Sequence, residues 1–209
     1  MARLEIETAS GPAWADLDLA PNAPAVLMVG HGAGGTVDAP DLLAVRDAAV
    51  AVGVSVARIT QPYRVAGRRA PAPAPRLDQA WLAAHAALRR RRGWRTLPFV
   101  LAGRSSGARV ACRCADASGA AAVVALAFPV HPPGQPAKSR VEELSAVRVP
   151  LLVVQGRADP FGQPPPELFD GVTRVLVPLP GDHSLRVARH EVGATVAAFL
   201  IALGLTSAR

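Results

Sequence analysis

The chain has 209 residues, a length that fits one domain with a sizeable core. Half of the residues are hydrophobic but only 4% are aromatic, so the core must consist mainly of Ala, Val and Leu, as in buried parallel strands covered by helices. The formal net charge of +7 would suit an anionic partner. Lys138 is the only lysine, however, and the densest arginine run, residues 89–92, has no aromatic side chains within it, which argues against nucleic-acid binding.

Membrane, secretory and metal-binding classes find no support in the sequence either. No run approaches the ~18 apolar residues that span a bilayer, and residues 1–10, which include Glu5 and Glu7, lack the apolar stretch of a secretory signal. Cys112 and Cys114 lie close together on a predicted helix, in a spacing that suits neither a disulfide nor a metal site. We therefore expect a cytoplasmic protein in a reducing compartment, with no metal and no other cofactor.

Strand patterns alternate with helical patterns along the chain. A hairpin of residues 3–7 and 13–17 would supply edge strands. Most later apolar runs are continuous, as strands covered on both faces should be; they span residues 25–29, 54–59, 99–101, 123–128, 151–155 and 174–177. Helical patterns fall at residues 41–52, 77–92, 106–117 and 185–203, with short helical turns at 141–145 and 166–169. This order predicts an α/β fold, with a doubly wound, mostly parallel sheet and helices on both faces.

Two proline-rich segments are predicted to be irregular. Residues 62–75 are expected to form a long loop that leads into a helix, and residues 130–136 a second loop after a strand. Gly93 and Gly204 follow predicted helix ends, where a glycine commonly terminates the helix. With no internal repeat and no dividing linker, we expect residues 1–209 to form a single domain.

The first catalytic signal is Gly103-Arg-Ser-Ser-Gly, a G-x-S-x-G motif. It follows a predicted strand and opens a helix, the setting in which a strained elbow exposes the serine oxygen. Ser105 is therefore the expected nucleophile. Ser106 is the rival, but Arg104 stands where it would need a flanking glycine, and the Ser106 N–H is better placed as an oxyanion donor. A glycine-rich turn capped by serines remains the structural alternative.

An acid and a base follow later strands in the order that this fold requires, Ser, then Asp, then His. Asp159 lies just past the strand at residues 151–155, and His183 just past the strand at residues 174–177. The histidine would accept the serine proton, and the carboxylate would hold the imidazole in the correct tautomer. Asp182 is an alternative acid, although it is adjacent to His183 and would struggle to reach that side chain.

A glycine-rich segment, His31-Gly-Ala-Gly-Gly, follows the first core strand. A second oxyanion donor is expected from this loop. We predict that the N–H of Ala33 pairs with the N–H of Ser106 in this role. A phosphate-binding loop is the competing interpretation, but the segment matches neither G-x-G-x-x-G nor the P-loop pattern.

Several segments together resemble the dienelactone-hydrolase-like branch of the α/β-hydrolase superfamily, and within it the group that contains the hydrolase domain of a subunit of the NSL acetyltransferase complex. They are His31-Gly-Ala-Gly-Gly, Gln61-Pro-Tyr with Gly67-Arg-Arg, Gly103-Arg-Ser-Ser-Gly, Phe128-Pro-Val-His-Pro-Pro-Gly, Gln155-Gly-Arg-Ala-Asp-Pro-Phe-Gly and Gly181-Asp-His. The resemblance implies a compact, lidless hydrolase with the triad named above and no cofactor. It implies no particular substrate. Relatives often carry an apolar residue at the position of Ser106. The serine in this sequence departs from that pattern but leaves the backbone amide intact.

The leading hypothesis is a serine hydrolase, a carboxylesterase or dienelactone-hydrolase-like enzyme, that acts on small esters or thioesters through an acyl-enzyme intermediate. So short a chain leaves no room for a large cap, so the cleft should be open and shallow. The alternative is a catalytically silent interaction module, because some eukaryotic members of the resembled group are parts of chromatin complexes. We expect a monomer or homodimer with a small-molecule ester as its partner, and neither nucleic acid nor membrane.

Arginines are the expected substrate-binding residues, because the planar guanidinium suits a carboxylate. Arg104 precedes the nucleophile, and Arg68, with Arg64 and Arg69, lies in the segment after the second core strand. His131 is a further candidate for the pocket wall. These residues predict an acidic or polar group near the scissile ester. The alternative is that the arginines form ordinary ion pairs and that His131 is structural.

Overall fold

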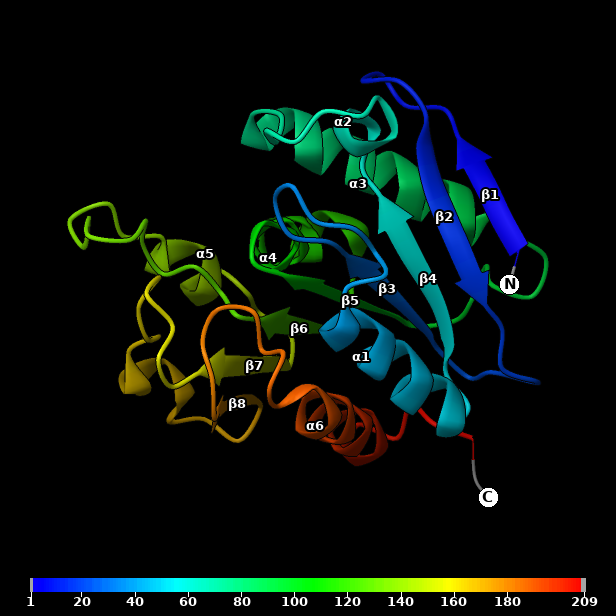
Figure 1. The fold of residues 1–209 in the computed structure, drawn as a ribbon. Coiled ribbons are helices and arrows are strands. Elements are labelled where there is room, and N and C mark those ends of the chain that lie inside the picture. Colours follow the sequence, from blue (N-terminus) through cyan, green and yellow to red (C-terminus); the bar gives the residue numbers. More distant parts are fainter. Residues whose placement is uncertain (1, 208–209) are drawn as a thin grey trace.

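Eight strands form one sheet, in the order β1-β2-β4-β3-β5-β6-β7-β8 (Figure 1). The computed structural model describes residues 2–207. β2 pairs antiparallel with β1 and β4, and all other pairs are parallel. The predicted doubly wound, mostly parallel sheet is thus confirmed. The strands are β1 Ala2–Ile6, β2 Ala13–Asp18, β3 Val26–Gly30, β4 Ser55–Thr60, β5 Phe99–Arg104, β6 Ala122–Leu126, β7 Leu151–Gly156 and β8 Arg174–Leu179.

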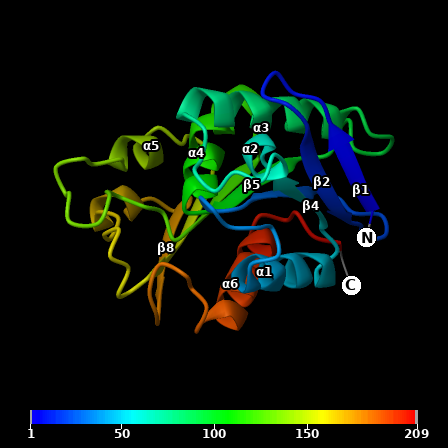
Figure 2. The same ribbon diagram turned by 45° about the horizontal axis from the view of Figure 1, so that its top comes forward.

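Helices cover both faces of the sheet. α1 and α6 lie side by side on one face, and α3 and α4 cover the other (Figures 1 and 2). No lid domain stands over the strand ends in the part of the chain that the structure describes. The helices are α1 Pro40–Ala51, α2 Pro62–Val65, α3 Ala74–Arg89, α4 Ser106–Ser118, α5 Val141–Ser145 and α6 Arg189–Ala202, with a 3-10 helix at Pro166–Phe169.

The two apolar layers explain why the central strands are continuously hydrophobic. In β3, Val26 and Met28 belong to the layer under α3 and α4, whereas Leu27 and Val29 belong to the layer under α1 and α6. All four side chains are fully buried. Because successive strand residues point to opposite faces, a strand covered on both sides needs apolar residues at every position.

Proline placement corrects two of the predicted boundaries. The segment at residues 62–75 is not a continuous loop, since it contains α2, and α3 begins at Ala74 rather than at residue 77. Pro62 and Pro75 each stand in a first helical turn, where the missing N–H costs nothing and the fixed φ suits a helix. Prolines here start helices instead of excluding them.

The predicted start of the closing helix and the predicted end of α3 also need correction. The closing helix begins at Arg189 instead of residue 185, because Leu185 has a φ of +51° that no helix interior tolerates. α3 ends at Arg89, so Gly93, with a φ of +84°, belongs to the turn that follows and does not cap the helix. The prediction for Gly204 is confirmed, since it follows α6 with a φ of +66°.

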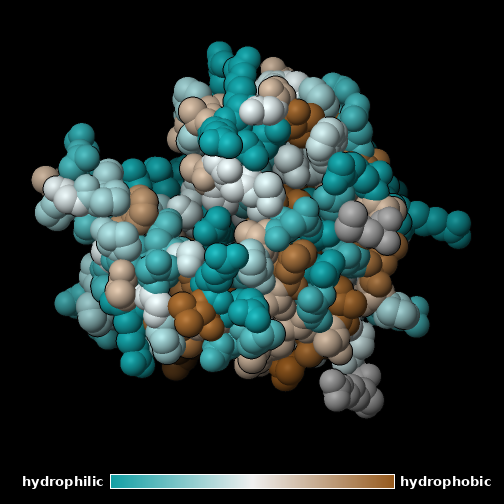
Figure 3. All heavy atoms as spheres, in the orientation of Figure 1, coloured by the Kyte–Doolittle hydropathy of each residue, from teal (hydrophilic) through white to brown (hydrophobic). Residues whose placement is uncertain are grey.

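The surface carries few large apolar groups. In the view of Figure 3, hydrophilic side chains are spread over this face, and hydrophobic ones reach the surface in small groups. Among residues 2–207, no helix has the length and apolar character needed to cross a bilayer.

His85 is a buried titratable group in the layer under α3. Its ring meets the edge of Phe99 with centroids 4.8 Å apart, and its Nε2 has no hydrogen-bond partner among the described residues. Burial, assisted by the positive charge of Arg89, lowers the pKa of His85 to about 4. The folded protein therefore holds this imidazole neutral at a pH where the unfolded chain protonates it.

This difference predicts that acid weakens the fold through His85. The unfolded pKa of about 6.5 exceeds the folded one, so the stabilising contribution is complete above about pH 6.5 and is lost as the pH falls toward 4. The free energy of unfolding should drop by about 3 kcal/mol across this window from His85 alone. Denaturant titrations at several pH values should show a flatter profile for His85→Leu. The exposed His190 supplies the control, His190→Leu, which should keep the parent profile. Parallel profiles for the parent and His85→Leu would contradict this account.

Candidate active site

A tight turn between β5 and α4 presents Ser105 at the end of the central strands. Ser105 has a φ of 54° and a ψ of −112°, a backbone conformation that L residues rarely adopt. Its N–H donates to the carbonyl of Leu126 in β6 (2.9 Å), and its carbonyl accepts the N–H of Arg109 in α4 (3.2 Å). These two hydrogen bonds hold the strained residue from both sides, so the serine is fixed in position.

The glycines of the motif are required by the close approach of backbone segments. A Cβ on Gly103 would lie 2.3 Å from the carbonyl carbon of Gly107, and a Cβ on Gly107 would lie 2.6 Å from the carbonyl oxygen of Gly30. Gly30 and Gly103 are themselves register partners in β3 and β5. The first turn of α4 can therefore sit against both strand ends only because these positions lack side chains.

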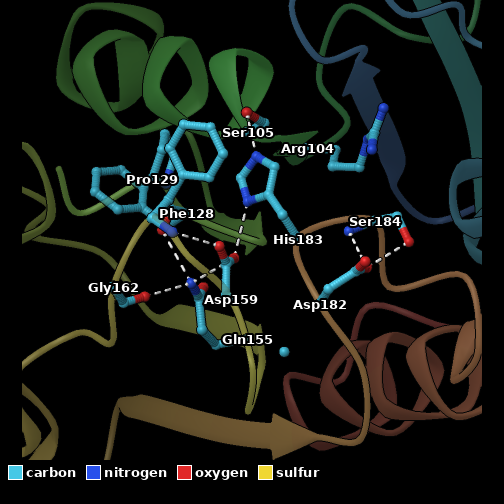
Figure 4. A network of polar contacts seen from close by, with 12 residues as sticks. Arg104, Ser105, Phe128, Pro129, Gln155, Asp159, Gly162, Asp182, His183 and Ser184 are labelled. Carbon is cyan, nitrogen blue, oxygen red and sulfur yellow. Dashed lines mark hydrogen bonds and ion pairs between the residues drawn. The ribbon is translucent and has the colours of Figure 1, made fainter. Parts of the chain in front are cut away.

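The structure brings together the three residues that the sequence singled out for a triad. His183 Nε2 lies 2.8 Å from Ser105 Oγ, and His183 Nδ1 lies 2.8 Å from Asp159 Oδ2 (Figure 4). The three side chains come from the segments that follow β5, β7 and β8. Parallel strands end at one edge of a sheet, which is why residues 78 and 24 positions apart in the sequence can meet there.

Asp159 is held by a set of buried donors. Its side chain is fully shielded from solvent. Oδ1 accepts the N–H of Phe161 (2.8 Å), and Oδ2 accepts both His183 Nδ1 and the amide of Gln155 (2.9 Å). The carbonyl oxygens of Phe128 (3.1 Å) and Gly162 (2.9 Å) lie within hydrogen-bond distance of the same nitrogen, so three acceptors share its two hydrogens (Figure 4). A buried carboxylate with this many donors keeps a single orientation.

Gln155 and Phe161 both stand in a segment that carries the family resemblance, but their roles beside Asp159 and His183 were not predicted. The ring of Phe161 stacks on His183, with centroids 4.0 Å apart and planes 28° apart. The one signal for Gln155 is a polar residue within an otherwise apolar strand, since it is completely buried in β7. Phe161 gave no signal of its own beyond its place next to the Asp159 turn.

Asp182, the alternative acid, is engaged elsewhere. Its Oδ1 accepts the N–H (2.9 Å) and the hydroxyl (2.6 Å) of Ser184. These hydrogen bonds lower the pKa of Asp182. In Figure 4 the carboxylate points toward Ser184 and away from the imidazole of His183. The contact to His183 Nδ1 is thus made by Asp159.

The glycine-rich loop after β3 is held by a buried histidine. His31 is 3% exposed; its Nδ1 lies 2.9 Å from the carbonyl oxygen of Gly32, and its Nε2 accepts the N–H of Gln61 (3.1 Å). Nε2 must therefore be unprotonated, and Nδ1–H donates to Gly32. Burial, and then the charges of Arg64 and Arg104, lower the pKa of His31 despite its bond to the Gly32 carbonyl. A neutral His31 fixes the entry to the loop.

The residues of both predicted oxyanion donors line the same cleft as Ser105. Ala33 and Ser106 both line a cleft of about 330 Å³ that also contains Ser105 and His183. Ser106 is the first residue of α4, so its N–H has no acceptor within the helix. Arg64 does not line this cleft but donates from Nε to the carbonyl of Gly35 (2.9 Å) and so supports the loop.

The predicted substrate-binding residues are not all in this cleft. Arg104 lines it, but Nε of Arg104 lies 3.5 Å from the buried Asp41, and its side chain points away from the Ser105–His183 pair in Figure 4. His131 lies against Gly162, with Nδ1 2.9 Å from the carbonyl oxygen of Pro132, and does not line the cleft. Arg68 lines a separate hollow near residues 62–79.

Two arginines in the cleft wall were not predicted, Arg109 and Arg140. Pro71, Pro129 and Phe161 complete its apolar lining. A larger hollow of about 590 Å³ lies between β2 and α1, but it contains no nucleophile paired with a base, so the chemistry of the side chains favours the smaller cleft. Among residues 2–207, no group of three or more His, Cys, Asp or Glu side chains is arranged to hold a metal ion.

Comparison with known families identifies the chain. The model of the Alpha/beta hydrolase domain family matches residues 23–203. The chain belongs to this family. None of the curated proteins matches the α/β-hydrolase chain by sequence. The family match does not reach down to the narrower group with the NSL-complex subunit, to which the sequence motifs pointed.

Solved structures share the fold of this α/β-hydrolase over nearly its full length. XC6422 from Xanthomonas campestris, described as a serine hydrolase without a lid, has a TM-score of 0.78 and 22% identity, covering 100% of this chain and 96% of its own. Est1E from Butyrivibrio proteoclasticus has a TM-score of 0.78 and 16% identity, covering 97% and 99%. A dienelactone hydrolase from Anabaena variabilis has a TM-score of 0.78 and 17% identity, covering 96% of each chain.

The backbone contact at the elbow predicts a severe effect of one added methyl group. Gly103→Ala would place its Cβ within 2.3 Å of backbone atoms that cannot move independently, so the free energy of unfolding should fall by about 3 kcal/mol or more. Gly171→Ala is the matched control, because a Cβ there meets nothing within 4 Å, and it should change stability by about 0.5 kcal/mol or less. Urea denaturation measures both. Equal stabilities of the two variants would contradict the steric argument.

Proposed function

We propose that the protein is a one-domain serine hydrolase that cleaves small esters or thioesters through an acyl-enzyme intermediate, with Ser105, His183 and Asp159 as its catalytic triad. The observation that carries the proposal is the unbroken chain of 2.8 Å contacts from Asp159 through His183 to Ser105. The names of two of the similar structures, a serine hydrolase and a dienelactone hydrolase, support the same class.

The proposed reaction follows these contacts. His183 Nε2 takes the proton of Ser105 as Oγ attacks the carbonyl carbon, and Asp159 stabilises the imidazolium that results. The N–H groups of Ala33 and Ser106 donate to the oxyanion. The alcohol or thiol leaves with the proton from His183, and a water activated by the same histidine then releases the acid and restores Ser105. Phe161, stacked on His183, limits the tilt of the imidazole during both proton transfers.

The cleft supports a small substrate. A volume of about 330 Å³ lies at the low end of ligand pockets, and the described chain has no lid over it. Of the predicted substrate-binding residues, Arg104 contributes to the cleft wall. His131 contributes indirectly, because its backbone N–H donates to the carbonyl of Phe161 (3.0 Å), which lines the cleft. Arg68, in its separate hollow, has no part in the proposal. We also propose that the protein belongs to the narrower group that contains the hydrolase domain of the NSL-complex subunit.

A fluorophosphonate probe tests the proposal directly, because it reacts covalently with activated serines. We expect an adduct at Ser105, mapped by mass spectrometry of the digested protein, that Ser105→Ala abolishes and His183→Ala slows by about 10³-fold or more. A labelled wild type then justifies a screen of small esters and thioesters. If folded wild-type protein is not labelled, the hydrolase proposal fails and the catalytically silent interaction module replaces it.

Two aspartates beside His183 allow a matched comparison. Asp159→Asn removes the acceptor for His183 Nδ1–H and favours the wrong tautomer, so kcat on the best ester should fall by about 10³- to 10⁴-fold. Asp182→Asn keeps a side-chain oxygen for Ser184 and should retain kcat within about threefold, since an exposed polar substitution of this kind is nearly neutral. A larger loss in Asp182→Asn than in Asp159→Asn would reverse the assignment of the acid.

A further inference from the structure

The wall of the cleft has an unusual charge composition. Of its lining residues, Arg104, Arg109 and Arg140 carry full charges, and no Asp or Glu lines the described part of the cleft. Asp159 stands behind His183 and is shielded from solvent. A substrate that enters this cleft therefore meets positive charge, in walls of low dielectric that strengthen its field.

Carboxylates outside the cleft wall neutralise two of these arginines. Arg104 lies 3.5 Å from the buried carboxylate of Asp41. Arg109 binds Glu143 in bidentate fashion, through Nε (2.9 Å) and Nη2 (2.5 Å). Glu143 and Asp78 also bind Arg113, at 3.2 and 2.7 Å. In this network of α3, α4 and α5, the positive charges of two arginines are balanced by the negative charges of two carboxylates.

Arg140 differs from both. No carboxylate of residues 2–207 lies within ion-pair distance of its guanidinium, whose one hydrogen bond is a long contact of 3.4 Å from Nη1 to the carbonyl of Pro129. The side chain is half-buried. Burial, and then the charge of Arg109, lower the pKa of Arg140, and Glu143 offsets this only in part. The environment thus leaves a positive charge in the cleft with no carboxylate of the described residues in ion-pair contact.

The backbone of Arg140 is well fixed, so its side chain starts from a defined point. Its N–H donates to the carbonyl of Val130 (2.7 Å), which closes the loop between β6 and α5, and α5 begins at the next residue. Pro129, whose carbonyl the guanidinium touches, lines the cleft beside Ser105. A ligand anion could therefore bind Arg140 without rearrangement of the backbone.

We propose that the physiological substrates are esters or thioesters that carry a carboxylate, and that Arg140 binds this carboxylate while the scissile carbonyl lies at Ser105. The planar guanidinium can form two parallel hydrogen bonds to a carboxylate, which a neutral substituent cannot offer. The assignment rests on the proposed hydrolase function and specifies its substrate class. It moves the anion-binding role from the arginines that the sequence predicted, Arg104 and Arg68, to Arg140, a cleft residue without a carboxylate in ion-pair contact.

Matched ester pairs test the assignment. Mono-para-nitrophenyl succinate carries a carboxylate on the acyl side, and its methyl ester does not; para-acetoxybenzoate carries one on the leaving group, and its methyl ester does not. The readout is the ratio of kcat/KM for the anionic ester to that for its neutral partner. We expect Arg140→Gln to lower this ratio by about 10- to 100-fold in at least one pair, the range that a charge-assisted hydrogen bond supplies. The affected pair identifies the side of the ester that faces Arg140.

Two further variants separate charge from structure. Arg140→Lys keeps the charge but not the planar fork, so its ratio should lie between those of the wild type and Arg140→Gln. Arg90→Gln, an exposed arginine at the end of α3 remote from the cleft, should keep the wild-type ratio. Rising salt should lower the wild-type ratio and leave that of Arg140→Gln unchanged.

The possible failures are distinguishable. If fluorophosphonate labels Ser105 in wild type and Arg140→Gln alike, and the ratio is the same in both for both pairs, the carboxylate assignment is wrong while the hydrolase function stands. If Ser105 is not labelled in the wild type and neither pair is hydrolysed, the hydrolase function itself has failed, and the assignment falls with it.

Discussion

The close approach of α4 to the ends of β3 and β5 is the constraint on which the rest of the site depends. Gly103 and Gly107 permit backbone separations that any Cβ would prevent. This contact forces the chain to reverse at Ser105 in a strained conformation and places Ser106, whose N–H has no acceptor within α4, at the cleft. The proposed oxyanion donor and the proposed nucleophile thus come from one piece of backbone geometry, so a change in the packing at Gly30 would shift both.

A second requirement is electrostatic. Asp159 is completely shielded from solvent, a costly state for a carboxylate unless donors replace the lost water. Phe161, Gln155 and His183 supply these donors, and each also has another task in the site. Gln155 connects the end of β7 to the segments around Phe128 and Gly162. The carboxylate therefore organises its own surroundings as much as it orients the histidine.

The many arginines of the sequence have several different structural roles. Arg64 supports the glycine-rich loop through a carbonyl, and Arg109 and Arg113 share Glu143. Arg104 is balanced by Asp41. Most of the charge near the site is thus used in holding segments together. The uncompensated Arg140 stands out against this background, and a bulk charge of +7 contains no information about it.

Local sequence was sufficient for the strand runs, the parallel order, the elbow at Ser105 and the positions of Asp159 and His183 after their strands. These follow from hydrophobic periodicity, glycine sterics and chain order, which are properties of short segments and their succession. The starts of α2 and α3 were misjudged, because a proline that ends one helix can also begin another. Only the tertiary structure decided that Arg140 rather than Arg68 lines the cleft and that Gln155 and Phe161 hold Asp159 and His183. The direction in which a loop side chain points, and the charges it meets there, depend on elements far away in the sequence, so no local pattern encodes them.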